Sequence, residues 1–247
     1  MIVKKQRLDQ ILFNRNLAES KTKAQAMIMA GQVFVEGKPI SKSGFNINHN
    51  ATIEIKNLGP KWVSRGATKL ITALDKNKII VKNKICIDLG SSTGGFTDVL
   101  IQSGANKVYA VDVGTNQLHE KLKKNNKIIS LEKTNARYLK KDQFEELIDI
   151  MVCDVSFISL KKVIEPNLHL LKKEGIIIAL IKPQFESKKN ETKKGVIKDS
   201  IIHQRICNEI SEWFETIYDS RVLSIIESPI KGPKGNIEFL ITVKFQK

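Results

Sequence analysis

Apolar and polar segments alternate regularly from about residue 63 to the end of the chain. Short apolar runs predict strands at residues 85–89, 107–112, 150–154, 175–181, 221–228 and 237–245. Longer segments of mixed polarity separate these runs and predict helices. Because strands that alternate with helices usually form a parallel sheet, the pattern predicts an α/β fold with a Rossmann-like, doubly wound sheet over residues 63–247. Such sheets bind their ligands at the carboxyl ends of the strands.

The first 62 residues follow a different pattern. Apolar residues recur there at nearly helical spacing, at Leu8, Ile11, Leu12 and Leu17. Ser20 is a suitable N-cap for a second helix, which Gly31 would end. Residues 32–37 and 52–55 then alternate like short strands. The segment 1–62 is therefore predicted to be a small α+β domain of its own.

The net charge of the chain bears on which kind of partner it binds. The 247 residues include 41 Lys and Arg against 26 Asp and Glu, which gives a formal net charge of +15. A positive excess favours a polyanionic partner such as nucleic acid, because each neutralised phosphate releases condensed counterions. An AT-rich genome, which inflates Lys, Asn and Ile everywhere, would produce the same excess. Charge alone therefore does not decide between RNA binding and a generally basic composition.

Several classes of protein are excluded by what the sequence lacks. No apolar run is long enough to span a bilayer, and residues 1–6 lack the apolar region of a secretory signal. A cytoplasmic protein without membrane contact is therefore predicted. The three cysteines, Cys86, Cys153 and Cys207, suggest no disulfide frame, and the four histidines show no ligand spacing, so no metal site is expected. Oligomeric state cannot be predicted from these features.

A glycine-rich turn follows the apolar run at residues 85–89. A P-loop would need a lysine after its second glycine, and a dinucleotide fingerprint would need glycine at position 92, which is Ser92. The stretch instead resembles S-adenosylmethionine-dependent methyltransferases, which have an acid at the strand end, here Asp88, and then Gly-x-x-x-Gly, here Gly90 and Gly94. Ser92, between the two glycines, is a further candidate contact of the cofactor. Asp112, after the next strand, could accept both ribose hydroxyls. A tight strand-to-helix turn without a ligand is the simpler alternative.

Other residues are weaker candidates for the same pocket. Asn135, after the apolar run 128–131, is predicted to face the adenine. Phe96 and Phe157 could shape the pocket, although such aromatic residues more often belong to a core. The polar, basic segment 188–194 is either a loop that clamps RNA or a solvated loop.

The first domain carries motifs of an RNA-binding module. The short motifs Arg7-Leu-Asp9 and Glu19-Ser-Lys21, followed by residues 29–37, resemble the S4 domain. Glu36 stands where that family often has Asn. The resemblance implies that RNA is bound mostly through backbone charge and shape. The candidate RNA-binding residues are Arg7, Arg15, Lys21, Lys23 and Lys38.

Four strings in the second part of the chain carry a closer resemblance. Residues 64–70, 154–160, 181–186 and 232–239 are similar to the TlyA family, whose members have an S4 unit ahead of an FtsJ-like catalytic domain. The resemblance covers essentially the whole chain. It implies an S-adenosylmethionine-dependent ribose 2′-O-methyltransferase that acts on ribosomal RNA within ribosomal subunits. Cytidine in 23S RNA is the implied target, and 16S RNA is a second candidate.

The wider FtsJ-like group shares a Lys-Asp-Lys-Glu set. The motifs place its members at Lys69, Asp154, Lys182 and Glu238. The resemblance implies that Lys182 contacts the 2′-oxygen and accepts its proton, that Asp154 orients Lys182, and that Glu238 anchors Lys69. Each residue also has a simpler interpretation: an exposed helix lysine for Lys69, a cap of the following segment for Asp154, a solvated loop charge for Lys182 and a solvated strand residue for Glu238.

Two other classes of function remain open from the sequence. One is a membrane-acting haemolysin, a label that the family has carried, although the chain offers no long basic amphipathic helix. The other is a non-catalytic RNA-binding protein whose second domain is a vestigial methyltransferase fold. Thermal stabilisation by the cofactor would discriminate between this alternative and an enzyme.

Overall fold

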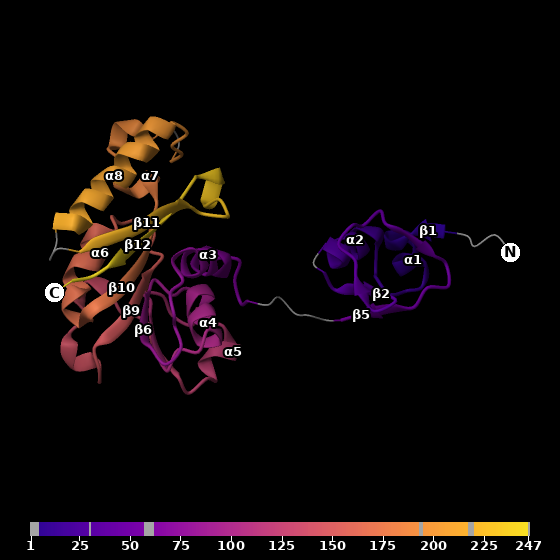
Figure 1. Ribbon diagram of the computed structural model, residues 1–247, viewed down its shortest axis with the longest axis horizontal. Coiled ribbons are helices and arrows are strands. Elements are labelled where there is room, and N and C mark those ends of the chain that lie inside the picture. Colours follow the sequence, from indigo (N-terminus) through magenta and orange to yellow (C-terminus); the bar gives the residue numbers. More distant parts are fainter. Residues whose placement is uncertain (1–4, 30, 57–61, 193–194, 217–219, 247) are drawn as a thin grey trace. The chain divides into compact units, whose positions relative to one another are not determined.

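The computed structural model describes residues 5–29, 31–56, 62–192, 195–216 and 220–246. The chain divides into two compact units, Met1–Lys61 and Trp62–Lys247 (Figure 1). Each unit has its own hydrophobic core.

The first unit combines two helices with short strands. Its elements are β1 (Lys5–Arg7), α1 (Leu8–Asn14), α2 (Lys21–Met29), β2 (Val33–Val35), β3 (Lys38–Pro39), β4 (Asn46–Asn48) and β5 (Ile53–Ile55). Strand β1 pairs with β4, and β2 lies between β3 and β5, all antiparallel. The Ser20 hydroxyl accepts a hydrogen bond from the Lys23 backbone N–H at 3.1 Å, as expected of an N-cap. Buried Leu8, Leu12 and Ile28 form the centre of the core.

The turn between β2 and β3 contains the glutamate that stands where the S4 domain often has Asn. Glu36 and Gly37 both have positive φ, 48° and 74°. Asn reaches such a conformation more easily than Glu does. The Glu36 carboxylate accepts a hydrogen bond from the Thr52 backbone N–H at 2.7 Å. The Glu36 carboxylate is therefore held against the backbone at Thr52.

The second unit is built on a sheet of seven strands. The strands are β6 (Ile85–Leu89), β7 (Lys107–Val111), β8 (Ile128–Leu131), β9 (Ile148–Cys153), β10 (Leu171–Ile181), β11 (Arg221–Glu227) and β12 (Phe239–Lys244). Their order is β11-β12-β10-β9-β6-β7-β8. The five strands from β10 to β8 are parallel, and β12 runs antiparallel to both β10 and β11. This is the predicted α/β architecture, with one antiparallel insertion that the apolar pattern did not reveal.

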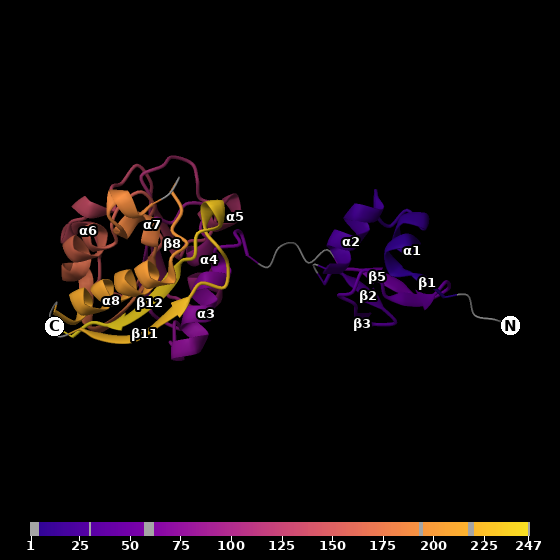
Figure 2. The same ribbon diagram turned by 90° about the horizontal axis from the view of Figure 1, so that it is seen from above.

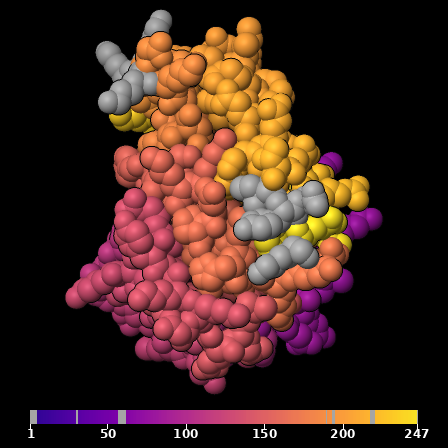
Figure 3. All heavy atoms as spheres, turned by 90° about the vertical axis from the view of Figure 1, so that its left-hand side faces the viewer, coloured from indigo at the N-terminus to yellow at the C-terminus, as the bar shows by residue number. Residues whose placement is uncertain are grey.

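Helices cover both faces of this sheet (Figures 1 and 2). The helices are α3 (Ala67–Asn77), α4 (Gly95–Gln102), α5 (Glu120–Lys123), α6 (Lys161–Ile164), α7 (Pro183–Glu186) and α8 (Ser200–Thr216), and the 3-10 turns are Ala136–Tyr138, Lys141–Gln143, Glu165–Leu170, Lys189–Glu191 and Pro233–Gly235. Helices α3 and α4 pack on one face through Leu70, Val99 and Leu100. On the other face, α6 and α8 contribute Ile164, Ile206 and other residues to a larger cluster. Figure 3 views the side with α6 and α8, where the orange atoms of α8 lie next to the redder segment around α6.

Candidate active site

Strand register brings the four residues of the Lys-Asp-Lys-Glu set to one edge of the sheet. Asp154 follows β9 directly, and Lys182 follows β10 directly, at the carboxyl ends of two parallel neighbours. Glu238 immediately precedes β12, whose first residue, Phe239, pairs with Ile181 in antiparallel register. Because β12 runs antiparallel to β10, its beginning lies at the edge where β10 ends.

These side chains form a continuous chain of ion pairs. Lys182 Nζ lies 2.6 Å from Asp154 Oδ1, and Lys69 Nζ lies 3.4 Å from Asp154 Oδ2. Lys69 Nζ also donates a hydrogen bond to Glu238 Oε2 at 2.8 Å. Lys69 enters from α3, on the face of the sheet that α4 also covers. Three separate segments and a helix thus supply one cluster.

Burial distinguishes this cluster from an ordinary surface ion pair. Lys69 and Lys182 are each 7% exposed, and Glu238 is 1% exposed. Charges removed from water are stable only when opposite charges and hydrogen bonds compensate them. Two ammonium groups and two carboxylates balance formally. The simpler interpretations of Lys69 as an exposed helix lysine and of Glu238 as a solvated strand residue are therefore wrong.

Gly232 makes room for the buried carboxylate. A Cβ atom at this position would overlap Glu238 Oε1. The Gly232 N–H bonds to the carbonyl of Asn236 at 2.9 Å, which closes the bend before β12. The Gly-Pro-Lys-Gly sequence therefore serves the site by folding tightly over Glu238.

The glycine turn between β6 and α4 lies beside the ionic cluster. Gly90 has φ +84°, and a Cβ atom there would lie 3.0 Å from both the Asp154 carbonyl oxygen and a methyl group of Val155. Gly94 has φ +93°, and a Cβ there would collide with Leu118 and Leu122. Both glycines are needed for a positive φ and a close approach.

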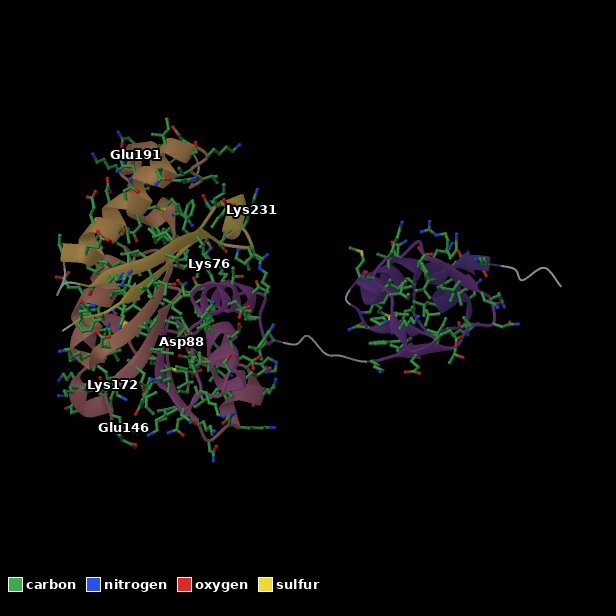
Figure 4. The ribbon with its side chains drawn as sticks, viewed as in Figure 1. Lys76, Asp88, Glu146, Lys172, Glu191 and Lys231 are labelled. Atoms are coloured by element: carbon green, nitrogen blue, oxygen red, sulfur yellow. The ribbon has the colours of Figure 1, made fainter. Side chains whose placement is uncertain are left out.

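Asp88 lies inside the domain at the end of β6 (Figure 4). Its Oδ2 accepts hydrogen bonds from the Thr97 backbone N–H at 3.0 Å and from the Thr97 hydroxyl at 2.7 Å. Its other oxygen, Oδ1, is buried and has no hydrogen-bond partner in the described part of the chain. Burial raises the pKa of Asp88 to about 7, against the lowering effect of Thr97. The carboxyl thus presents one unused acceptor atom at the edge of the site.

Asp112, which directly follows β7, is hydrogen-bonded to the glycine turn. Its Oδ2 accepts the Ser92 backbone N–H at 2.8 Å, and its Oδ1 accepts the Gly114 backbone N–H at 2.7 Å. Each carboxylate oxygen has a further lone pair for another donor. Ser92 itself has φ +48°, so the turn places a non-glycine residue in the left-handed region.

A cavity of about 220 Å³ joins the glycine turn and the ionic cluster. Its lining contains all four residues of the cluster and three of the predicted cofactor residues, Asp88, Gly90 and Ser92, together with Phe96 and Ser156. Ser64 and Gly66, which precede α3, and Pro233 are among its other lining residues, whereas the predicted Gly94 and Asp112 are not part of this lining. The turn and the charged residues therefore share one site.

Comparison with known proteins identifies this arrangement. The FtsJ-like methyltransferase family matches residues 62–245, and the S4 domain matches residues 6–53. Hemolysin A of Brachyspira hyodysenteriae is 42% identical over 95% of this chain and 98% of its own length. The 16S/23S rRNA (cytidine-2′-O)-methyltransferase TlyA of Mycobacterium tuberculosis is 34% identical over 99% of this chain and 92% of its own. The chain belongs to the TlyA family of FtsJ-like methyltransferases.

A solved structure supports the same assignment. A candidate hemolysin from Streptococcus thermophilus matches this TlyA-family chain with a TM-score of 0.74 and 37% identity, covering 99% of this chain and 90% of its own. No described helix of this TlyA-family chain is both long and apolar enough to cross a membrane. Among the described residues, no group of three or more His, Cys, Asp or Glu side chains could hold a metal ion.

Some predicted site residues of the TlyA-family chain lie elsewhere. Asn135 caps the 3-10 turn Ala136–Tyr138, because its Oδ1 accepts the Arg137 N–H at 3.1 Å, and it does not belong to the described lining of the cavity. Phe157 is also outside that lining; it is 89% exposed and packs on Phe185 with 5.1 Å between ring centroids. In the segment 188–194, Glu191 pairs with Arg205 at 2.8 Å, whereas residues 193 and 194 lie outside the described residues.

The predicted RNA-binding residues fall into two groups. Arg7 pairs with Asp9 at 2.7 Å, and Arg15 donates to the backbone carbonyls of His49 and Ala51. These guanidinium groups therefore have structural partners within the first unit. The lysines Lys21, Lys23 and Lys38 are exposed.

Sequence reasoning missed one side chain that contacts the cluster and one that holds the loop after it. The Ser156 hydroxyl accepts a hydrogen bond from Lys182 Nζ at 2.8 Å. Glu186, at the end of α7, accepts the Ser159 hydroxyl at 2.7 Å and the Leu160 backbone N–H at 2.6 Å. Both lie inside motif strings of the family resemblance, at residues 154–160 and 181–186. Their position inside these motif strings is the signal from which the sequence could have identified them.

Proposed function

We propose that the protein is an S-adenosylmethionine-dependent ribosomal RNA ribose 2′-O-methyltransferase. The observation that carries the proposal is the chain of ion pairs through Lys182, Asp154, Lys69 and Glu238, in one cavity with the glycine turn. Family membership supports methyl transfer, and the rRNA (cytidine-2′-O)-methyltransferase name of the Mycobacterium relative supports cytidine in 16S or 23S RNA as the target.

The residues around the turn fit the cofactor. Gly90 brings backbone to the strand ends without a side chain, and Asp88 Oδ1 is a buried acceptor that suits an ammonium group. Asp112 keeps lone pairs for two hydroxyl groups. When bound, S-adenosylmethionine supplies an activated methyl group. Gly94, Ser92 and Asn135 are proposed contacts of lesser weight, since Asn135 is engaged as a helix cap.

The protein's own residues have two tasks in this reaction: to accept one proton and to hold the reacting groups in the right orientation. A ribose hydroxyl becomes a better nucleophile when a positioned base takes its proton. Lys182 lines the cavity and is proposed as that base, with the proton moving from the 2′-oxygen to Nζ. Asp154 lies between Lys69 and Lys182 and is proposed to orient Lys182. Glu238 neutralises Lys69 and fixes its position.

The first unit is proposed to bind RNA within ribosomal subunits. Its match to the S4 domain and its exposed Lys21, Lys23 and Lys38 support a contact with phosphates. Arg7 and Arg15 would contribute to binding mainly by holding the fold of this unit, because both already have partners.

The test is methylation of separate ribosomal subunits with labelled S-adenosylmethionine, followed by mapping of the modified ribose. Incorporation at a 2′-oxygen of rRNA is the expected result. Absence of transfer to either subunit, with the cofactor bound, would contradict the proposed function. Leakage of liposomes by the pure protein without S-adenosylmethionine would instead favour the activity implied by the name of the Brachyspira relative.

A further inference from the structure

The Lys182 ammonium is held by two groups that act differently. Asp154 Oδ1 lies 2.6 Å away as an ion pair, yet in the described structure this oxygen has no contact with hydrogen-bond geometry. Ser156 Oγ lies 2.8 Å from Nζ and does have that geometry, with Lys182 as the donor. Asp154 therefore stabilises the positive charge of Lys182, whereas the hydrogen bond to Ser156 orients its Nζ.

The orientation of Nζ matters because a neutral amine accepts a proton only at its lone pair. A neutral lysine has two N–H groups and one lone pair in a tetrahedral arrangement, and only the lone pair accepts a proton. When one N–H donates to Ser156, rotation about the last carbon–nitrogen bond is restricted, and the charge of Asp154 attracts the second N–H to its side. The remaining tetrahedral position then holds the lone pair. Lys182 lines the cavity, so this position is available to a hydroxyl bound there.

The loop that carries Ser156 is fixed to the segment that carries Lys182. Phe157, the next residue, has φ +65°, which is an uncommon conformation for a bulky side chain and requires support from its surroundings. Glu186 supplies that support by accepting hydrogen bonds from Ser159 and from the Leu160 N–H. Because α7 begins directly after Lys182, Glu186 connects the two segments within a few residues of the contact.

We propose that Ser156 is a positioning residue that aims the Lys182 lone pair at the substrate hydroxyl. The inference rests on the proposed function. The hydroxyl O–H bond breaks, its electron pair stays on the oxygen, and a new N–H bond forms on Lys182. Nζ then keeps its bond to Ser156 as an ammonium group. Ser156 itself neither gains nor loses a proton.

The test compares three variants of the full chain in single-turnover methylation of ribosomal subunits at saturating S-adenosylmethionine. Ser156→Ala removes the acceptor, and Ser156→Thr keeps it on an exposed residue that has room for a methyl group. Ser103→Ala is the matched control, because Ser103 follows α4 at the end remote from the glycine turn and lines a different cavity. The affinities for cofactor and for subunits, and the unfolding midpoint, are measured for each variant.

We expect Ser156→Ala to lower the single-turnover rate ~10-fold or more, as for loss of a hydrogen bond to a charged group. Both affinities should stay within about two-fold, Thr should restore most of the rate, and Ser103→Ala should match the unchanged chain. An unaltered rate in Ser156→Ala would overturn the inference, as would equal loss in the Ala and Thr variants, which would indicate a role of loop shape. If the unchanged chain transfers no methyl group, the proposed function itself fails, and this outcome is distinct from both.

Discussion

Strand β9 has an aspartate between two lysines at each of its ends, and the two arrangements differ in burial. At the carboxyl end, Asp154 lies between Lys69 and Lys182, whose side chains are 9% and 8% exposed. At the opposite end, Asp149 lies 3.5 Å from Lys84 and 3.0 Å from Lys172, whose side chains are 44% and 40% exposed.

Pairing of charges is therefore not what distinguishes the candidate active site, because both ends of β9 have it. The lysines near Asp149 can exchange their partner for water at little cost, so their contribution is small. The lysines near Asp154 cannot, and any change in one charge is felt by the whole cluster. Figure 4 labels Lys172, which lies on the outside of the domain. Buried lysine at a cavity is the informative feature.

The largest expected effect compares lysines from the two ends. Lys182→Ala removes the proposed base and should lower the methylation rate ~100-fold or more, since general bases contribute about that much. Lys172→Ala removes an exposed partner of Asp149 and should leave the rate within about two-fold. Single-turnover rates on ribosomal subunits measure both. Cofactor affinity, measured by calorimetry, should be similar in the two variants; a Lys182→Ala enzyme with full activity would contradict the assignment.

The second prediction concerns stability. Glu238→Gln keeps the shape of the side chain but leaves Lys69 short of one negative charge in a buried position. Breaking a buried pair in this way should cost about 3 kcal/mol of the free energy of unfolding. The two tryptophans, Trp62 and Trp213, both lie in the second unit, so their fluorescence during urea unfolding reports on that unit. A loss of less than about 1 kcal/mol would mean that Glu238 does not stabilise the cluster.

The apolar pattern of the sequence predicted one half of this site better than the other. Asp154 and Lys182 each follow an apolar run, so a parallel sheet puts them at one edge. Lys69 and Glu238 were located by family resemblance alone, because one lies on a helix before the first strand and the other before an antiparallel strand. Neither position follows from the order of strands along the chain. Their burial was not predictable either, since helix lysines are usually exposed.

Local contacts account for the remaining differences. Asn135 has the spacing of a pocket residue, but its side chain is used to cap the following 3-10 turn. The role of Ser156 depends on the path of a loop whose next residue, Phe157, has positive φ. A sequence pattern does not encode such a conformation for phenylalanine. The glycine turn, by contrast, was predictable, because Gly90 and Gly94 are required where φ is positive and neighbours are close.

The third prediction uses a buried acid near the functional end. Burial raises the pKa of Asp88 to about 7, so the folded chain binds a proton that the unfolded chain has lost. The stability contributed by the protonated form is fully present below about pH 4 and is lost as the pH rises through 7, at up to about 1.4 kcal/mol per pH unit. Asp88→Asn, whose amide oxygen can still accept from Thr97, should remove this dependence. Urea unfolding at several pH values measures it, and parallel curves for both proteins would contradict the raised pKa.

The smallest effect is expected for the aspartate at the other end of β9. Burial raises the pKa of Asp149, but hydrogen bonds from the Ile85 N–H and from Lys172 outweigh it, so the pKa lies below its ordinary value. The sign is opposite to that of Asp88: the stabilisation is present above about pH 4 and is lost as the pH falls further.

Asp149→Asn keeps an acceptor for the Ile85 N–H and loses only the charge, so it should cost about 1 kcal/mol of unfolding free energy at neutral pH. The cost should shrink in high salt, because both lysines are solvated and their attraction is screened. Glu238→Gln, in the same salt series, should keep its cost, since its ion pair is buried. Equal salt sensitivity of the two variants would mean that burial does not separate the two ends of the strand, and the distinction between them would fail.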